Sequence, residues 1–198
     1  MALPEEADGR RLRREHNREA VLDALVALFG EGNYHPNANQ IAERAGLSPR
    51  SLFRYFDDID DLHDAVIERE LEAALPLVEL GVGPDAPTRD KIDAIAEARV
   101  RLYEAVAPAA RAARVSVHRH AVIGRQVHRS RAFLRHQLEE FLAPELNGHA
   151  DVLPALDALC SFETYDLLRA DQGLSREATV SALVTALTSL LSSPGGSA

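Results

Sequence analysis

The sequence predicts an all-α fold of about nine helices: an N-terminal three-helix domain with a helix-turn-helix, followed by a C-terminal antiparallel helical bundle. Three observations support this fold class. No segment alternates apolar and polar residues as a strand does, apolar residues recur at three- and four-residue intervals, and 46% of the 198 residues are hydrophobic. The single cysteine, Cys160, excludes an internal disulfide and is expected to be a small buried side chain.

The first two helices are predicted from an apolar stripe and from a capping pattern. The stripe predicts a helix over about residues 13–29 and consists of Val21, Leu22, Leu25, Leu28 and Phe29. Asn37 stands three residues before Gln40, which is the capping-box pattern, in which each side chain satisfies a backbone N–H of the first turn. This pair predicts a second helix over about residues 37–45.

A third helix is predicted to begin after Ser48 and to end near Phe56. Ser48 is a favourable cap, and Pro49 takes the first helical position, where its missing N–H is no loss. The second and third helices are short and are joined through Gly46, which can adopt the positive φ of a tight turn. Two short helices in this arrangement have the sequence shape of a helix-turn-helix.

The remaining helices follow an acidic turn at residues 57–61 and a linker rich in glycine and proline at residues 80–90. A fourth helix is expected between these two segments. Beyond the linker, apolar periodicity predicts helices over about residues 88–106, from 108 onward, and over about 130–142, 151–170 and 175–192. We therefore expect two domains, residues 1–60 and residues 61–198.

Charge is unevenly distributed along the chain. The net charge is −9, but residues 1–56 hold eight arginines and eight acidic residues, so the acidic excess lies in residues 57–198. Five of the eight arginines occur between residues 10 and 18. Such a basic run is typical either of a segment that binds an anionic partner or of a solvated tail.

The third helix is predicted to present an unusual outer face. The residues expected to face the core are Ile41, Ala42, Ala45, Leu47, Leu52 and Tyr55. The outer face then carries Pro49, Arg50, Ser51, Phe53 and Arg54. Arginine can bond two acceptors of a guanine edge, and phenylalanine can contact thymine methyl groups, so this face suits the major groove of DNA. The alternative is a helical hairpin whose arginines are merely solvated.

The stretch from Ile41 to Leu62 resembles the DNA-binding domain of the tetracycline-repressor (TetR) family. The family pattern is carried by Ile41, Ala42, Ala45, Gly46, Leu47, Ser48, Leu52, Phe53, Tyr55, Phe56 and Leu62. The resemblance covers about residues 10–75. It implies a homodimer that binds a palindromic double-stranded DNA operator, and an all-helical C-terminal domain that binds a small-molecule effector and dimerises through its last two helices.

Two sets of DNA contacts are expected on this basis. The residues expected to read bases are Arg50, Ser51, Phe53 and Arg54. The residues expected to hold phosphates are Ser48, Tyr55, Arg10, Arg11, Arg13 and Arg14. The chain departs from the family at Ile59, where a lysine that contacts a phosphate is usual, and four aspartates surround this position. We expect the arginine run to replace the lost contact.

The resemblance also implies a ligand pocket between the middle helices of the C-terminal domain. Its candidate residues are Tyr103, Phe133, Gln137, Phe162, Glu163 and Tyr165. No metal or cofactor is expected, although this region holds His118, His120, His128, His136 and His149. The recurring histidines are eight residues apart, which is not the spacing of a ligand pair on a helix. The same residues lack a nucleophile–base arrangement, so no catalytic residue is expected.

The sequence therefore favours a DNA-binding transcriptional regulator, not an enzyme: a cytoplasmic, dimeric repressor that a small molecule releases from its operator. No apolar segment is long enough to cross a membrane, and the polar N-terminus does not have the pattern of a secretory signal. The alternative is a helical ligand-binding or storage protein, or an enzyme, that has lost DNA binding. Ile59 and its neighbouring aspartates are the main support for this alternative.

Overall fold

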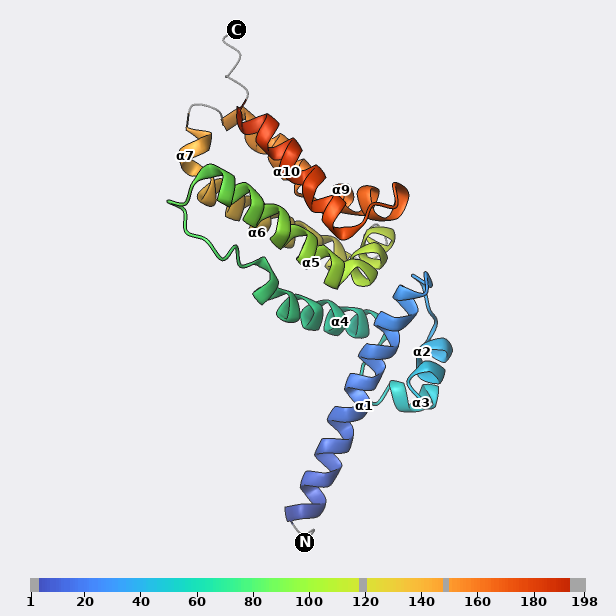
Figure 1. Cartoon of the computed structure of the whole chain (residues 1–198). Helices are drawn as coiled ribbons and strands as arrows, with labels where there is room; N and C mark the ends of the chain where they lie inside the picture. Colours follow the sequence, from blue (N-terminus) through green and yellow to red (C-terminus); the bar gives the residue numbers. More distant parts are fainter. Residues whose placement is uncertain (1–3, 118–120, 148–149, 193–198) are drawn as a thin grey trace. The chain divides into compact units, whose positions relative to one another are not determined.

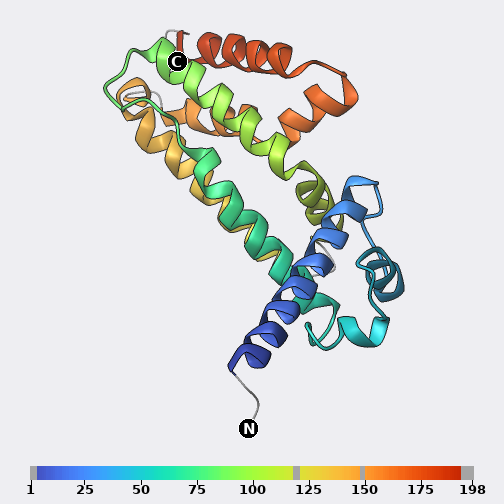
Figure 2. The same ribbon diagram turned by 60° about the horizontal axis from the view of Figure 1, so that its bottom comes forward.

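The computed structural model describes residues 4–117, 121–147 and 150–192. Within these ranges the chain forms helices and turns and no strand, so the all-α prediction is confirmed (Figure 1; Figure 2). The chain divides into two compact units. The first unit combines residues 1–72 with residues 108–126, and the second combines residues 73–107 with residues 127–198.

The first unit holds the predicted N-terminal helices. They are α1 (Pro4–Gly30), α2 (Ala38–Arg44), α3 (Pro49–Leu52) and α4 (Ile59–Ala74). Helix α1 begins well before the predicted start near residue 13, because proline suits a first turn and the following glutamates and arginines are good helix formers. Helix α3 is shorter than predicted, since it ends at Leu52 and a turn follows as far as Tyr55. In both views the N-terminal turns of α1 extend beyond α2 and α3 (Figure 1; Figure 2).

The core of the first unit forms where its four N-terminal helices meet. The fully buried side chains there include Leu22, Leu25, Ile41, Leu52 and Leu62. Beside this core, the guanidinium of Arg69 on α4 donates to Asp23 (2.7 Å) and to Glu19 (3.3 Å) of α1. These ion pairs and the apolar contacts hold α4 against α1.

The second unit holds most of the remaining helices. They are α5 (Thr88–Ser116), α6 (Ala121–Phe141), α7 (Ala143–Leu146), α8 (Leu153–Leu159), α9 (Phe162–Asp166) and α10 (Arg176–Ser192). The shorter segments are the 3-10 turns η1 (Leu75–Val78) and η2 (Ala150–Val152) and the π-helical turn η3 (Leu167–Asp171). Both α5 and α6 cross from one unit into the other. The described residues form ten α-helices, where about nine were expected.

Three predicted boundaries were wrong in this part of the chain. Pro108 does not separate two helices: α5 continues through it to Ser116, because apolar packing on both sides outweighs the one hydrogen bond that proline removes. Helix α6 begins at Ala121, not near residue 130. The segment 151–170 is not one helix, since the hydroxyl of Ser161 accepts from the backbone N–H of Thr164 (3.3 Å) and caps a new helix there.

The predicted domain division at residue 60 stays a prediction. The first compact unit continues past that point to residue 72, and it also takes in residues 108–126, which are distant in sequence. A compact unit is defined by contacts within the fold, whereas a domain is defined by its ability to fold or act alone.

In the second unit, α5 and α6 run antiparallel, because residues near the start of α5 pack against residues near the end of α6. The core residues include Ile92, Ile95, Leu138, Leu142, Leu156 and Leu187. Cys160 lies in the same core, and burial raises the pKa of its thiol to about 11. The expectation of a small buried side chain is thus confirmed, and the neutral thiol is a poor nucleophile.

Lys91, near the start of α5, is buried with 1% of its surface exposed. Its ammonium donates to the carboxylate of Glu145 on α7 at 3.1 Å and lies 5.7 Å from the ring centre of Phe141. The hydroxyl of Thr88 also donates to Glu145, at 3.0 Å. Burial acts to raise the pKa of Glu145, but the hydrogen bonds from Lys91 and Thr88 outweigh it and the pKa is lowered. This buried ion pair attaches the short helix α7 to α5.

Candidate nucleic-acid interface

The helix-turn-helix formed by α2 and α3 is built on local hydrogen bonds that the sequence predicted. The side-chain oxygen of Asn37 accepts from the backbone N–H of Gln40 (3.0 Å), and the Gln40 side chain accepts from the backbone N–H of Asn37 (2.9 Å). Gly46 in the turn has a φ of +69°. The hydroxyl of Ser48 accepts from the backbone N–H of Ser51 (3.2 Å) at the start of α3. The capping box, the left-handed turn and the serine cap are therefore confirmed.

The predicted inner face of the helix-turn-helix is also confirmed. Ile41, Ala42 and Leu52 are fully buried. Three further members are half-buried and pack against the same core: Ala45, Leu47 and Tyr55. Phe56, only 2% exposed, belongs to this core as well, although it had been assigned no inward role.

The outer face presents cationic and aromatic side chains to solvent. Arg50 and Arg54 are exposed, and among the described residues neither has an ion-pair or hydrogen-bond partner for its side chain. Phe53 is 48% exposed between them. Ser51 is half-buried, and its hydroxyl lies 2.9 Å from that of Ser48. The four residues predicted to read bases therefore lie together on α3 and on the turn that follows it.

The residues predicted to hold phosphates occupy two places in the first unit. Ser48 is exposed at the start of α3, and the hydroxyl of Tyr55 accepts from the side-chain amide of Asn17 (2.9 Å). The exposed arginines of α1 include Arg11, Arg13 and Arg14, while the side chain of Arg10 lies outside the described part of the structure. All four arginines belong to the continuous helix α1, which fixes the spacing of their backbone positions.

The acidic turn has a structural role at the start of α4. The side chain of Asp58 accepts from the backbone N–H of Asp61 (2.8 Å), and the side chain of Asp61 accepts from the backbone N–H of Asp57 (3.0 Å). The first bond satisfies an N–H group of the first turn of α4, and the second satisfies the N–H group of Asp57, just before the helix. Ile59, where a lysine is usual in the family, packs against the core of the first unit. Helix capping and apolar packing thus account for the departure from the family pattern.

Neighbouring carboxylates also affect Asp64, one turn further along α4. Burial raises the pKa of Asp64, and the negative charges of Asp60 and Asp61 raise it further. Arg125, from the first turns of α6, opposes this rise. The carboxylates at the start of α4 therefore create a negative electrostatic potential a few residues after the cationic outer face of α3.

These features have the geometry of a helix-turn-helix, in which a short capped helix presents exposed side chains that have no partner among the described residues. Residues 21–66 match the model of the bacterial regulatory proteins of the tetR family. The match runs from α1 into α4 and so includes the whole helix-turn-helix. This part of the chain is therefore similar to the regulatory proteins of the TetR family, in agreement with the resemblance of residues 41–62.

One curated relative is the HTH-type transcriptional activator FasR of Mycolicibacterium smegmatis, which is 30% identical over 91 residues. This stretch is 46% of the chain, and the chain spans only 42% of that relative's length. The similarity to this relative therefore covers only part of the chain.

Solved structures share the fold over most of the chain. A transcriptional regulator from Rhodococcus sp. Rha1 has a TM-score of 0.69 at 19% identity and covers 88% of this chain and 95% of its own. A TetR-like transcriptional regulator from Rhodococcus sp. RHA1 has a TM-score of 0.66 at 22% identity, with 89% and 97% covered. At these identities the likeness establishes the fold alone.

Three of the six predicted ligand residues lie together in the second unit. The ring of Tyr103 on α5 lies 5.6 Å from that of Phe162 and 5.7 Å from that of Tyr165, both on α9. All three side chains are buried, and the hydroxyl of Tyr103 donates to the backbone carbonyl of Cys160 (2.8 Å). They form an aromatic cluster between α5 and α9.

The other three predicted ligand residues do not join this cluster. Gln137 accepts from Arg99 (2.9 Å) and donates to the backbone carbonyl of Val78 (2.8 Å). Glu163 forms an ion pair with Arg131. Phe133 is 51% exposed on α6. The candidate pocket of six residues is thus divided among separate surroundings.

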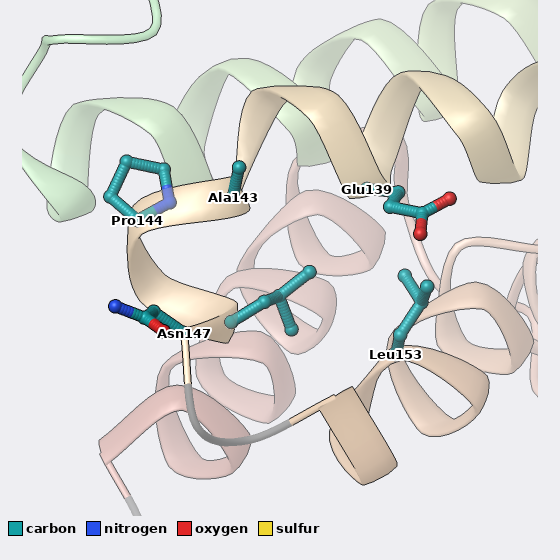
Figure 3. Close-up of a pocket in the computed structure, with 6 residues that line it drawn as sticks. Glu139, Ala143, Pro144, Asn147 and Leu153 are labelled. Carbon is teal, nitrogen blue, oxygen red and sulfur yellow. The ribbon is translucent and has the colours of Figure 1, made fainter.

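The hollows found in the described residues are not lined by these six side chains. One hollow of about 340 Å³ is open to solvent where α6, α7 and α8 meet, and Figure 3 shows its lining residues, of which five are labelled: Glu139, Ala143, Pro144, Asn147 and Leu153. A much smaller one, about 20 Å³, lies in the first unit between Phe29, His63 and the alanines of α5. A ligand site is usually a deep pocket into which several polar groups point, and neither of these two hollows has both properties.

Sequence reasoning overlooked Arg99 on α5. This arginine is 1% exposed and lies on the same helical face as Tyr103, one turn further along. A signal was present in the sequence, since Arg99 interrupts the apolar stripe that includes Ile92 and Ile95. It was missed because arginines elsewhere on these helices are mostly solvated.

Two further expectations concern metals and membranes. No group of three or more histidine, cysteine or acidic side chains in the described ranges is placed to hold a metal ion. His118, His120 and His149 lie outside those ranges. None of the helices that the structure describes is long and apolar enough to span a membrane.

Proposed function

We propose that the protein is a dimeric, sequence-specific regulator that binds a palindromic operator through α3 and the following turn. The observation that carries this proposal is the outer face of α3, where Arg50 and Arg54 are exposed beside an exposed Phe53 and have no partner among the described residues. An apolar ring beside two free cations has no evident structural use on a solvated surface. It fits the major groove, where arginine bonds guanine edges and phenylalanine contacts thymine methyl groups.

Base readout is assigned to Arg50, Ser51, Phe53 and Arg54. The hydroxyl of Ser51 is already hydrogen-bonded to that of Ser48, which leaves it fewer ways to bond a base. The arginines therefore supply most of the discrimination. Each two-bond contact to a guanine contributes about 1–3 kcal/mol.

Phosphate contacts are assigned to Ser48, Tyr55, Arg10, Arg11, Arg13 and Arg14. Since Ile59 cannot contact a phosphate through an ionic bond, the cationic turns of α1 take over this role. Their extension beyond α2 and α3 supports the assignment (Figure 1). Such contacts strengthen binding to any sequence and make it sensitive to salt.

The dimer is assigned to the last two helical segments, α8–α9 and α10. Apolar side chains of α10 lie on more than one side: Leu183 and Leu187 are buried, while Val180, Val184 and Leu191 are only half-buried. A second copy that covers the half-buried side would remove further apolar surface from water. Two recognition helices one DNA turn apart then require a palindromic site.

Regulation is assigned to a small molecule bound in the second unit, which releases the operator. The effector must prefer the conformation that does not bind DNA, since a ligand shifts an equilibrium only by its difference in affinity for the two states. The protein then acts as a repressor at the chromosome, in the cytoplasm. Activation of transcription is a second candidate function, because the relative from Mycolicibacterium smegmatis, 30% identical over 91 residues, is named an activator.

The rival proposal of a storage protein or enzyme without DNA binding loses its main support. The side chains of Asp58 and Asp61 accept backbone hydrogen bonds at the start of α4, and Ile59 packs on the core. Neither feature requires that DNA binding was abandoned.

The test is selection of binding sites from sheared genomic DNA at moderate salt with the purified full-length protein. We expect recovery of a short palindrome, and an Arg50→Ala, Arg54→Ala double variant should recover no common site. A protein that enriches no sequence, or enriches DNA without a shared motif, is not the regulator proposed. A reporter gene fused to the recovered site then distinguishes repression from activation. Deletion of the regulator raises reporter expression for a repressor and lowers it for an activator.

A further inference from the structure

The second unit buries an arginine, Arg99, for which the described residues provide no anionic partner. The Nη1 atom of Arg99 donates to the side-chain oxygen of Gln137 (2.9 Å), and Nη2 donates to the backbone carbonyl of Leu134 (3.0 Å). The Nε atom is buried and has no hydrogen-bond partner. Among the described residues no carboxylate lies within 4.0 Å of the guanidinium, although the side chain is 1% exposed.

Burial without an anion is unusual for this side chain. An arginine stays protonated in proteins, so it cannot lose its charge on burial as a lysine or histidine can. Buried charges are accordingly paired, because an uncompensated one destabilises the fold. Lys91, in the same helix and equally buried, follows this rule through Glu145. Arg99 has only neutral acceptors.

The surroundings of Arg99 suit the apolar body of an organic anion. Tyr103 lies one helical turn further along α5 and begins the aromatic cluster with Phe162 and Tyr165. Its hydroxyl bonds to the carbonyl of Cys160, the residue at which α8 ends. Although burial dominates the pKa of the Cys160 thiol, the positive charge of Arg99 acts to lower it, so this helix end lies within electrostatic reach of the guanidinium.

The segment that carries the aromatic rings of α9 is broken into short pieces. Helix α8 ends at Leu159, α9 has five residues, and residues 167–171 form a π-helical turn. Short helices gain little stability from their own hydrogen bonds, and π turns are frequent at functional sites. A shift of α9 away from α5 would open room beside Arg99, and the apolar part of a ligand would then replace the aromatic contacts that the shift removes.

We propose that Arg99 binds the carboxylate of the effector, and that the effector is a small monocarboxylic acid with an apolar body. The carboxylate accepts from the free Nε–H and from the second N–H of Nη2, the side-on pair of donors that arginine offers to a carboxylate. The aromatic cluster contacts the apolar body. This inference rests on the proposed function only where it treats the bound acid as the effector.

The first test is thermal unfolding of the full-length protein with 3-phenylpropionate or octanoate, each compared with its primary alcohol. The acids should raise the unfolding temperature and the alcohols should not. At about a hundred times the dissociation constant, the rise should be roughly 5 °C or more. Arg99→Met should remove the rise. Arg135→Met is the matched control, because Arg135 is an exposed arginine of α6 that pairs with Asp157, and its loss should leave the rise unchanged.

A second measurement needs no probe. In the ligand-free protein the buried guanidinium has no anion among the described residues to stabilise it. Replacing it in Arg99→Met should therefore leave the folding equilibrium constant, measured by urea titration, at least as large as in the wild type. A tenfold or greater loss would mean that Arg99 is a structural donor, and the proposal would be wrong. It would also be overturned by acids that stabilise the wild type no more than their alcohols do, or that stabilise Arg99→Met equally well.

The failure of this inference can be distinguished from failure of the proposed function. DNA affinity is measured separately, by fluorescence anisotropy on the selected operator. Acid-specific stabilisation without any change in operator affinity leaves the carboxylate site in place and contradicts release by that ligand. Operator binding without acid-specific stabilisation supports the regulator and overturns the site at Arg99.

Discussion

Two pairs of cationic side chains, one pair in each compact unit, are held in opposite ways. In the first unit, Arg50 and Arg54 are exposed and have no partner among the described residues. In the second unit, Lys91 and Arg99 are each 1% exposed. Exposed cations remain hydrated at little cost and are available to a polyanion such as DNA, whereas buried cations need an anion within the fold or from a ligand.

A net charge of −9 is compatible with the proposed DNA binding, because charge is unevenly distributed between the two units. The acidic residues mostly belong to the part of the chain after residue 56, while the described part of α1 exposes Arg11, Arg13 and Arg14, and α3 with its following turn exposes Arg50 and Arg54. The local distribution of charge, not its sum, sets which surface can approach a phosphate backbone. The following experiments test both sides of the comparison.

The largest effect is expected from Glu145→Gln in the second unit. The substitution leaves the buried ammonium of Lys91 without its carboxylate, so the free energy of unfolding should fall by about 3–5 kcal/mol in urea titration. Glu139→Gln is the control, because Glu139 is an exposed glutamate at the end of α6. A double variant, Lys91→Met with Glu145→Leu, should recover most of the loss. Equal stability of Glu145→Gln and its control would show that the pair contributes nothing.

The next largest effect is expected from Arg50→Ala on DNA specificity. Loss of a two-bond contact should lower the preference for the operator over a scrambled site by about 1–3 kcal/mol in anisotropy titrations, with non-specific affinity nearly kept. The matched control is Arg44→Ala, since Arg44 is an exposed arginine at the end of α2 that already pairs with Glu31. Equal loss of specificity in both variants would contradict the assignment of Arg50.

Removal of residues 1–14 should weaken binding to all DNA alike. The truncation deletes four arginines assigned to phosphates, and each lost contact should reduce the slope of affinity against salt by about 0.9. The ratio of operator to non-specific affinity should stay the same. An unchanged salt slope would mean that these turns of α1 do not touch the backbone.

A smaller effect is expected from Ser48→Ala at the cap of α3. The hydroxyl of Ser48 accepts from the backbone N–H of Ser51, so its loss should lower the free energy of unfolding by about 1 kcal/mol. Ser51→Ala is the control, because it keeps the capping hydroxyl. The cap assignment fails if thermal unfolding ranks the two variants in the opposite order.

The smallest effect is expected from acid on Glu145. Its pKa in the folded protein is lowered from the ordinary 4.5, so its stabilising charge is fully present above that value. Stability is lost as pH falls through the lower pKa of the folded state, because the unfolded chain binds the proton first. The difference in stability between the wild type and Glu145→Gln should therefore shrink below about pH 4.5. A difference that stays constant down to about pH 3 would argue against the pair.

The sequence alone determined the helix-turn-helix, because its determinants are local. The capping pair Asn37 and Gln40, the Ser48 cap and the left-handed turn at Gly46 each act within about four residues along the chain. Helical periodicity then sufficed to predict which side of α3 is buried and which is exposed. The all-α fold class followed from the same periodicity.

Only the tertiary structure decided the features that join distant residues. Lys91 meets Glu145 across 54 positions and Arg99 meets Gln137 across 38, and no local pattern encodes such pairs. The continuation of α5 through Pro108 and the break at Ser161 likewise depend on packing that competes with local preference. Local hydrogen bonds can be inferred from neighbours in sequence, but the burial of a charge is set by which helices surround it.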